Sequence, residues 1–282
     1  MKDHQQEYPV AKMAEVLQVS RSGYYRWLRE PRSHRQLTDE QLWIKIQFIY
    51  HRHHGRYGSP RITKDLREDG VHCGRHRVAR LMREHGLQAK TAHRFKVTTQ
   101  SDHDEPVAPN LVQQDFHADQ ANALWVSDIT YIWTDERWLY LAAVLDIYNR
   151  EVVGWCVHDR LTKDLVLAAI RQAIMRKDPG AGLVFHSDRG CQYASQAVRD
   201  LLAGHQIVQS MSGAGNCYDN AVMESFFHTF KVELVYQEKF TTRFQARQCI
   251  FEYLEVYYNR QRKHSALGYV APVQFGQMKQ VA

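Results

Sequence analysis

Residues 123–133 read "ALWVSDITYIW", a run of aromatic and β-branched side chains that predicts a β-strand. Two similar runs follow directly, "RWLYLAAVLDIY" at 137–148 and "REVVGWCVH" at 150–158. Only short turn segments separate the three runs, which predicts an antiparallel meander. Because neighbouring strands of a meander pair with each other, these residues decide the fold of the second half of the chain.

Helix and strand patterns alternate after the meander. Residues 162–177 carry apolar residues at helical spacing and stop before Pro179 and Gly180, so they predict an amphipathic helix. The other predicted elements are strands at 182–188 and 207–210, and helices at 195–206, from Asp219 onward and at 242–260. The resulting order βββαβαβα predicts the α/β class, with a mixed five-stranded sheet flanked by helices.

Charge is distributed unevenly along the 282 residues. Residues 1–100 hold 20 Lys and Arg against 10 Asp and Glu, whereas residues 101–282 hold 17 against 21. This asymmetry predicts a front half that meets a polyanion such as nucleic acid, and a back half whose chemistry needs carboxylates. The alternative for the front half is a basic surface that is simply solvated.

Cysteine spacing and hydropathy indicate the cellular compartment of the protein. The five cysteines are scattered without a Cys-x-x-Cys pair, which suits free thiols in a reducing cytoplasm. No apolar run approaches the roughly 20 residues needed to cross a bilayer. We expect a cytoplasmic protein without a membrane partner.

The first hundred residues predict a small all-α region. Residues 11–30 read as two short helices around a turn with Ser20 as N-cap, which suits either a helix-turn-helix in a DNA groove or a hairpin packed on its own domain. Three further helices are predicted at 38–53, with Thr38 and Gln41 as capping pair, at 58–70, with Ser59 as cap and Pro60 first in the helix, and at 73–87.

The last of these helices is rich in arginine. Arg75, Arg77 and Arg80 are candidates for contacts with DNA phosphates or a groove. Histidines cluster in the same region, but they lack cysteine pairs and lie among arginines, so the sequence argues against zinc; they are His51, His53, His54, His72 and His76.

Composition divides the chain into four segments. Prolines and acids without sustained periodicity predict a linker after the helical region. The predicted segments are 1–34 (helix-turn-helix-like), 35–96 (helical, DNA-binding), 97–118 (linker) and 119–282 (catalytic core with C-terminal helices).

Three carboxylates fall where a site can form. Asp128 lies midway along the first predicted strand, where an acid is costly without a partner, and Asp188 ends the fourth. Glu224 sits among apolar residues of a late helix. Any one of them alone suits a surface acid or a cap, but together they offer the hard oxygen ligands that Mg²⁺ prefers, with Mn²⁺ as a possible substitute.

Four longer motifs give these acids a family context. They are "WVSDITYI", "HSDRGCQY", "DNAVMESFF" and "YNRQRKHSALGY", preceded in the helical half by "RYGSPRITKDLREDG" and "HRVARLMREHGL". The sequence resembles the DDE transposases encoded by the second reading frame of many bacterial insertion sequences, which are similar to retroviral integrases and share an RNase H-like core. The 35 residues between Asp188 and Glu224 match the spacing that names this family's motif.

The resemblance implies metal-dependent DNA strand cleavage and strand transfer at insertion-sequence ends. Asp128, Asp188 and Glu224 would be the catalytic residues and the ligands of two Mg²⁺ ions. It also implies that Lys231 contacts DNA. On helical spacing Asn220 shares the face of Glu224, and we expect it to contact DNA as well. Arg262 and His264 belong to another family motif, and we expect them to contact DNA phosphates or to support the site. His186 and Tyr193, which flank Asp188, are expected to be packing residues.

The resemblance also implies a bacterial protein that is associated with the nucleoid, and it implies several partners. The expected partners are double-stranded DNA, as element terminal inverted repeats and target, further copies of the chain on DNA, and a first-reading-frame protein. Two other functions stay open from the residues: a non-catalytic DNA-binding regulator with a decayed core, and a structure-selective nuclease that cuts DNA without joining ends.

Overall fold

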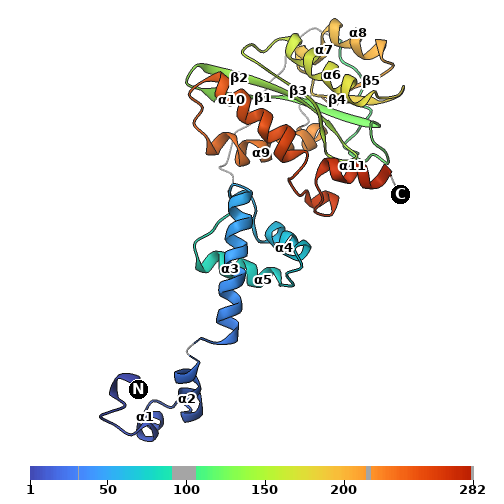
Figure 1. Ribbon diagram of the computed structural model, residues 1–282. Helices are drawn as coiled ribbons and strands as arrows, with labels where there is room; N and C mark the ends of the chain where they lie inside the picture. Colours follow the sequence, from blue (N-terminus) through green and yellow to red (C-terminus); the bar gives the residue numbers. More distant parts are fainter. Residues whose placement is uncertain (31, 91–105, 214–216, 281–282) are drawn as a thin grey trace. The chain divides into compact units, whose positions relative to one another are not determined.

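The computed structural model describes residues 1–30, 32–90, 106–213 and 217–280. The chain forms two compact units, Met1–Ala89 and Lys90–Ala282, which we describe separately (Figure 1). Much of the predicted linker at 97–118 lies outside the described residues.

The first unit is built from helices alone in its described residues. They are η1 Lys2–His4, α1 Val10–Val16, α2 Arg21–Arg29, α3 His34–Arg52, α4 Ser59–Glu68 and α5 Arg75–Glu84. Ser20 caps α2 by accepting a hydrogen bond from the backbone N–H of Gly23, as the sequence predicts. Gly70 and Gly86 follow α4 and α5 with φ of +76° and +71°, a backbone conformation that favours glycine after a helix end.

Two predicted helix starts are wrong. Helix α3 begins at His34 because Ser33 and Gln36 form a capping box, and Ser33 lies five residues ahead of Thr38. Helix α4 has Gly58 as N-cap, so Ser59 and Pro60 occupy its first two positions. In both cases the neighbouring sequence offers more than one acceptable start.

Helices α3, α4 and α5 share a compact apolar core. Its fully buried residues include Ile46 and Ile49 of α3, Ile62 of α4 and Val78 of α5. His53, from the histidine cluster, is buried at the end of α3, where its Nε2 lies 3.0 Å from Oδ2 of Asp65.

The second unit contains one five-stranded sheet in the order β3-β2-β1-β4-β5. The strands are β1 Leu124–Thr134, β2 Arg137–Asp146, β3 Val152–His158, β4 Val184–Ser187 and β5 Val208–Met211. Strands β1, β2 and β3 pair antiparallel, whereas β4 pairs parallel with β1 and β5 parallel with β4. The predicted meander and the mixed RNase H-like sheet are confirmed.

Helices cover both faces of this sheet (Figure 1). They are α6 Lys163–Lys177, α7 Cys191–Ala194, α8 Gln196–Gly204, η2 Cys217–Asn220, α9 Ala221–Glu233, η3 Val235–Gln237, α10 Arg243–Phe251, η4 Glu252–Tyr258, η5 Ser265–Leu267 and α11 Pro272–Gln280. The predicted helix at 242–260 is α10 followed by a π-helical segment, η4. No helix in the described part of the chain is long and apolar enough to cross a membrane.

Helix α6 packs closely on one face of the sheet. Trp125, Ala142 and Val144 point toward it and share one apolar core with it. At Gly154 of β3 a Cβ atom would lie 2.7 Å from the Cβ of Ala173, closer than such atoms can approach. A side chain at position 154 would therefore push α6 away from the sheet.

Aromatic side chains join α9 to the η4 segment. The ring centroids of Phe230 and Tyr253 are 5.4 Å apart, and those of Phe226 and Tyr258 are 5.1 Å apart. Edge-to-face contacts of this kind add to the stability that aromatic burial itself provides. They fix the helix that carries Glu224 to the C-terminal part of the unit.

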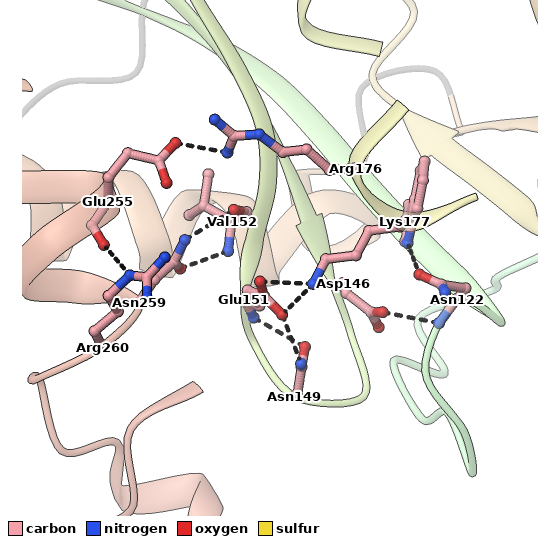
Figure 2. Close-up of polar contacts among 11 residues, drawn as sticks. Asn122, Asp146, Asn149, Glu151, Val152, Arg176, Lys177, Glu255, Asn259 and Arg260 are labelled. Atoms are coloured by element: carbon pink, nitrogen blue, oxygen red, sulfur yellow. Dashed lines mark hydrogen bonds and ion pairs between the residues drawn. The ribbon is translucent and has the colours of Figure 1, made fainter. Parts of the chain in front are cut away.

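Polar contacts fix the turn between β2 and β3 (Figure 2). The buried carboxylate of Asp146 accepts hydrogen bonds from the backbone N–H groups of Asn122 and Tyr148, at 2.8 and 2.9 Å. Lys177, at the end of α6, lies 2.7 Å from a carboxylate oxygen of Glu151. The turn is thus held from two sides.

The side chain of Asn259 joins the C-terminal segment to β3 (Figure 2). Its Nδ2 donates to the carbonyl of Val152 and its Oδ1 accepts from the N–H of Val152, both at 2.9 Å. Both residues are buried. The amide therefore satisfies an interior backbone pair that would otherwise be costly to bury.

The predicted linker is wrong in its described part near residues 109–112. The carbonyl of Pro109 accepts from Met211 N, and Leu111 N donates to Ser210 Oγ at 2.9 Å. Val112 is buried. These residues pack along β5 and belong to the second unit, which composition alone does not reveal.

Candidate active site

Asp128 lies in the middle of β1 and Asp188 directly follows β4, at the same level of these two neighbouring parallel strands. Ser127 of β1 pairs with Ser187 of β4, and each aspartate is the next residue in its strand direction. Asp128 Oδ1 accepts from Ile129 N at 2.7 Å, and Asp188 Oδ1 accepts from Gly190 N at 3.0 Å. The sheet therefore brings together two acids that lie 60 positions apart in sequence.

The electrostatics of Asp128 link all three predicted acids. Burial, and then the negative charge of Asp188, raise the pKa of Asp128 well above its usual range. The charge of Glu224 acts in the same direction. Asp128 thus lies within electrostatic reach of both other carboxylates.

Glu224 projects from the first turn of α9. Its side chain is exposed, and partial burial raises the pKa of Glu224. Among the described residues, however, no three Asp, Glu, His or Cys side chains lie close enough together to hold a metal ion. The acids are neighbours without forming a closed set of ligands.

Lys231 supplies a positive charge next to these acids. Its Nζ lies 4.8 Å from the centroid of the Tyr131 ring, a cation–π arrangement. Burial lowers the pKa of Lys231, and the neighbouring Tyr131 and Asp128 oppose that change. The cation is therefore half-buried between α9 and the outer half of β1.

His186 positions the approach to α9, a role beyond the expected packing. Its Nδ1 lies 2.8 Å from Ser210 Oγ, and its Nε2 lies 2.8 Å from the carbonyl oxygen of Asp219. Burial lowers the pKa of His186, which favours the neutral ring. Nε2–H then donates to the carbonyl and Nδ1 accepts from the hydroxyl, which joins β4 to β5 and to the residues before α9.

Tyr193 is tied to β1 beside Asp128. Its hydroxyl lies 2.7 Å from Ser127 Oγ, and Ser127 donates in turn to the carbonyl of Ala143 at 2.9 Å. Burial, and then the charges of Asp128 and Asp188, raise the pKa of Tyr193 well above its usual range. The only sequence signal for this role was a polar residue in the same motif as Asp188.

DNA contact by Asn220 and Arg262 stays a prediction, and both side chains are buried in this structure. Asn220 is buried at the start of α9. Arg262 is 5% exposed, and its Nε and Nη2 bind both carboxylate oxygens of Glu233 at 2.8–3.1 Å. Burial disfavours its charge, yet Glu233 outweighs this effect and raises the pKa of Arg262. In this structure Arg262 therefore pairs with Glu233 inside the second unit.

The remaining predicted DNA contacts differ in their surroundings. Arg77 and Arg80 both bind the carboxylate of Asp39, each at 2.6 Å, whereas Arg75 is exposed. His264 is half-buried near the C-terminus, where its backbone N–H donates to Val270. DNA contact by these four residues stays a prediction.

Sequence families match most of the described chain. Residues 118–217 and 224–279 match two families that are each described as an integrase core domain. Residues 36–95 match an HTH-like domain. The two integrase core matches include all three predicted acids. The HTH-like match includes the arginine-rich helix α5.

Similar proteins span nearly the whole chain. An uncharacterized 31 kDa protein of insertion element IS600 from Shigella sonnei is 44% identical over 263 residues, which cover 93% of this chain and 97% of that protein. Transposase InsF for insertion sequence IS3A from Escherichia coli K12 is 41% identical over 274 residues, covering 96% and 95%.

This extent of identity defines the class of protein. The chain belongs to the DDE transposases of insertion sequences, so its function is that of a transposase. Among solved structures, the HTLV-2 integrase catalytic core in complex with magnesium is 15% identical with a TM-score of 0.40, and covers 57% of this chain and 98% of that one.

Proposed function

We propose that this transposase cleaves DNA strands at the ends of its insertion sequence and joins the released 3′ hydroxyl to a second phosphodiester, in a divalent-metal-dependent reaction. The observation that carries the proposal is the convergence of charge at Asp128, whose pKa is raised by burial and by Asp188 and Glu224. Carboxylate oxygens that lie near one another are the ligands that divalent ions such as Mg²⁺ prefer.

The chemistry of the donors fits Mg²⁺, with Mn²⁺ as a substitute. Asp128, Asp188 and Glu224 would hold two ions through carboxylate oxygens. When bound, divalent cations supply activation of the attacking hydroxyl and stabilisation of the leaving oxygen. Because the described side chains do not yet converge on one point, the proposal includes an approach of Glu224 toward the two aspartates.

Residues of the chain itself would place the DNA. Lys231 lies beside Asp128 and would bind a phosphate next to the scissile one. Arg75 of the HTH-like region is exposed and would bind phosphates of the terminal repeat. Arg77 and Arg80 would join it once they leave Asp39, and His264 is a further candidate.

The proposed reaction joins separate DNA segments, and this requirement predicts which partners the chain binds. Element ends and target DNA must be held at the same time, so we propose that several copies of the chain assemble on DNA. A first-reading-frame protein with its own helix-turn-helix is a further proposed partner.

A cleavage and joining assay tests the proposal. Labelled duplexes carrying the element ends are incubated with the full chain, with and without Mg²⁺. The wild type should produce cleaved and joined strands only with the metal. Glu224→Gln should abolish both products while DNA binding changes less than about twofold, because the amide keeps the shape but ligates metal weakly.

The exposed Glu238 offers a matched control. Glu238→Gln removes the same charge outside the candidate site and should retain activity. Normal strand transfer by Glu224→Gln in Mg²⁺ would refute the assignment of the site. Cleavage without joining by the wild type would indicate a nuclease, and metal-independent binding without cleavage would indicate a regulator.

A further inference from the structure

Three large aromatic side chains lie exposed on one face of the β1–β2 hairpin. Trp133 is 54% exposed, Tyr131 is 43% exposed and Trp138 is 42% exposed. Trp133 and Trp138 are directly paired across the strands, so their side chains share a face, and Tyr131 lies on that face two residues earlier. We name these three residues the hairpin platform.

The platform rings pack against one another at their edges. The centroids of Trp133 and Trp138 are 4.9 Å apart with planes at 76°, and those of Tyr131 and Trp138 are 5.1 Å apart with planes at 89°. Trp133 and Trp138 pack edge to face and keep exposed indole surface for a further planar group, whereas Lys231 lies over the Tyr131 ring. Exposed apolar side chains that lie in contact with one another often mark a binding surface.

Backbone contacts hold the hairpin in place. At its tip, Asp135 N donates to the carbonyl of Phe240, and Arg243 N donates to a carboxylate oxygen of Glu136 at 2.8 Å. Thr134 Oγ1 donates to the carbonyl of Arg137 across the turn. A surface fixed in this way loses little conformational entropy when it binds a partner.

The platform lies on the same strand as Asp128, but the odd spacing puts the Asp128 side chain on the opposite face of β1. Because β4 pairs with β1 only as far as Ser127, a DNA strand would reach the platform around the edge of β1 beside Lys231. Asp128 and Trp133 are on the same strand, five residues or about 17 Å apart, and Tyr131 is about 10 Å from Asp128. Stacked nucleotides repeat every ~3.4 Å, so these distances span roughly three to five nucleotides. Lys231 lies between, against the Tyr131 ring and within electrostatic reach of Asp128.

We propose that the hairpin platform stacks unpaired bases of the DNA end whose scissile phosphate lies at the acids. The inference rests on the proposed function, and it names the state of the substrate that the site takes: an end with its last few pairs opened. A cation followed by aromatic faces is the pattern that binds a single strand, because phosphates take the charge and bases take the rings.

A binding comparison between paired and opened ends tests this proposal. Two labelled duplexes share one sequence, but in one of them the last three nucleotides are unpaired. Fluorescence anisotropy in EDTA measures Kd for the full chain. The wild type should prefer the opened end, and Trp133→Ala with Trp138→Ala should reduce affinity for it by about 5- to 150-fold while affinity for the paired end stays within about twofold.

Two controls separate stacking from general damage. Trp133→Phe with Trp138→Phe keeps aromatic faces and should keep most of the preference. Phe244→Ala removes a 69% exposed aromatic residue of the same unit and should leave both affinities unchanged. Equal losses on both duplexes, or no loss on either, would overturn the proposal.

The rival occupant of the platform is a second copy of the chain. Sedimentation velocity of the wild type and of the double alanine variant decides this point: loss of an oligomer in the variant would overturn the nucleotide proposal. Because binding is measured without metal, the platform can pass this test even if strand cleavage fails, so failures of the two proposals are distinguishable.

Discussion

Helix α9 carries a glutamate near each end, and the two have opposite surroundings. Glu224 is exposed in the first turn, and its charge acts on another acid, Asp128. Glu233 is buried in the last turn, where it binds Arg262 and accepts a hydrogen bond from the Tyr253 hydroxyl at 2.9 Å. A buried carboxylate that is paired with a cation serves the fold, whereas an exposed carboxylate near another acid is available to a ligand.

The largest expected effect comes from removing the cation that pairs with the buried Glu233. Arg262→Ala leaves the Glu233 carboxylate buried without its cation, which should cost about 3–5 kcal/mol of unfolding free energy. Urea unfolding of the full chain, followed by circular dichroism, measures the loss. Arg260→Ala is the matched control, because that arginine is exposed, and its effect should stay within about 0.5 kcal/mol.

A double variant sharpens the same prediction. Glu233→Met with Arg262→Leu removes both charges and should restore most of the stability that Arg262→Ala loses, since no unpaired ion remains. If the double variant is as unstable as the sum of its single variants, the pair is not what stabilises this end of α9.

The amide of Asn259 should give the next largest effect. Asn259→Ala leaves the buried N–H and C=O of Val152 without partners and should cost about 2–3 kcal/mol in the same unfolding measurement. Gln261→Ala, at an exposed neighbouring position, provides the reference. If the two variants lost similar amounts of unfolding free energy, the N–H and C=O of Val152 would have found other hydrogen-bond partners.

Asp39 gives a smaller, pH-dependent effect in the first unit. Burial alone would raise the pKa of Asp39, but hydrogen bonds from Arg80 and Arg77 outweigh it and lower that pKa. A lowered folded-state pKa means that its stabilisation is present above about pH 4 and is lost as the pH falls through the folded-state value. Thermal unfolding between about pH 2 and pH 6 should show this loss in the wild type and a flatter profile in Asp39→Asn.

The smallest expected change in stability is at Glu224. The raised pKa of Glu224 shows that the fold disfavours its ionised form, so Glu224→Gln should alter the unfolding free energy by no more than about 0.5 kcal/mol. Urea unfolding run beside the cleavage assay makes the contrast direct. A loss comparable to that of Arg262→Ala would show that both glutamates serve the fold.

Local patterns predicted most elements because their signals are local. Strands β1 to β3 followed from runs of aromatic and β-branched residues, and helix α6 followed from apolar residues at helical spacing. The start of α3 did not, because the Ser33–Gln36 pair satisfies the same capping rule as the pair predicted at Thr38 and Gln41. Periodicity also does not distinguish the π-helical turn of η4 from an ordinary helix.

By itself, the sequence determined the order of the elements, the transposase motifs and the three candidate acids, because each of these is written in neighbouring residues. Only the tertiary structure decided what polar side chains do. Arg262 is buried against Glu233, 29 positions away, and Tyr193 binds Ser127, 66 positions away. Such pairs depend on which chain segments the packed core brings together, so they cannot be predicted from local sequence patterns.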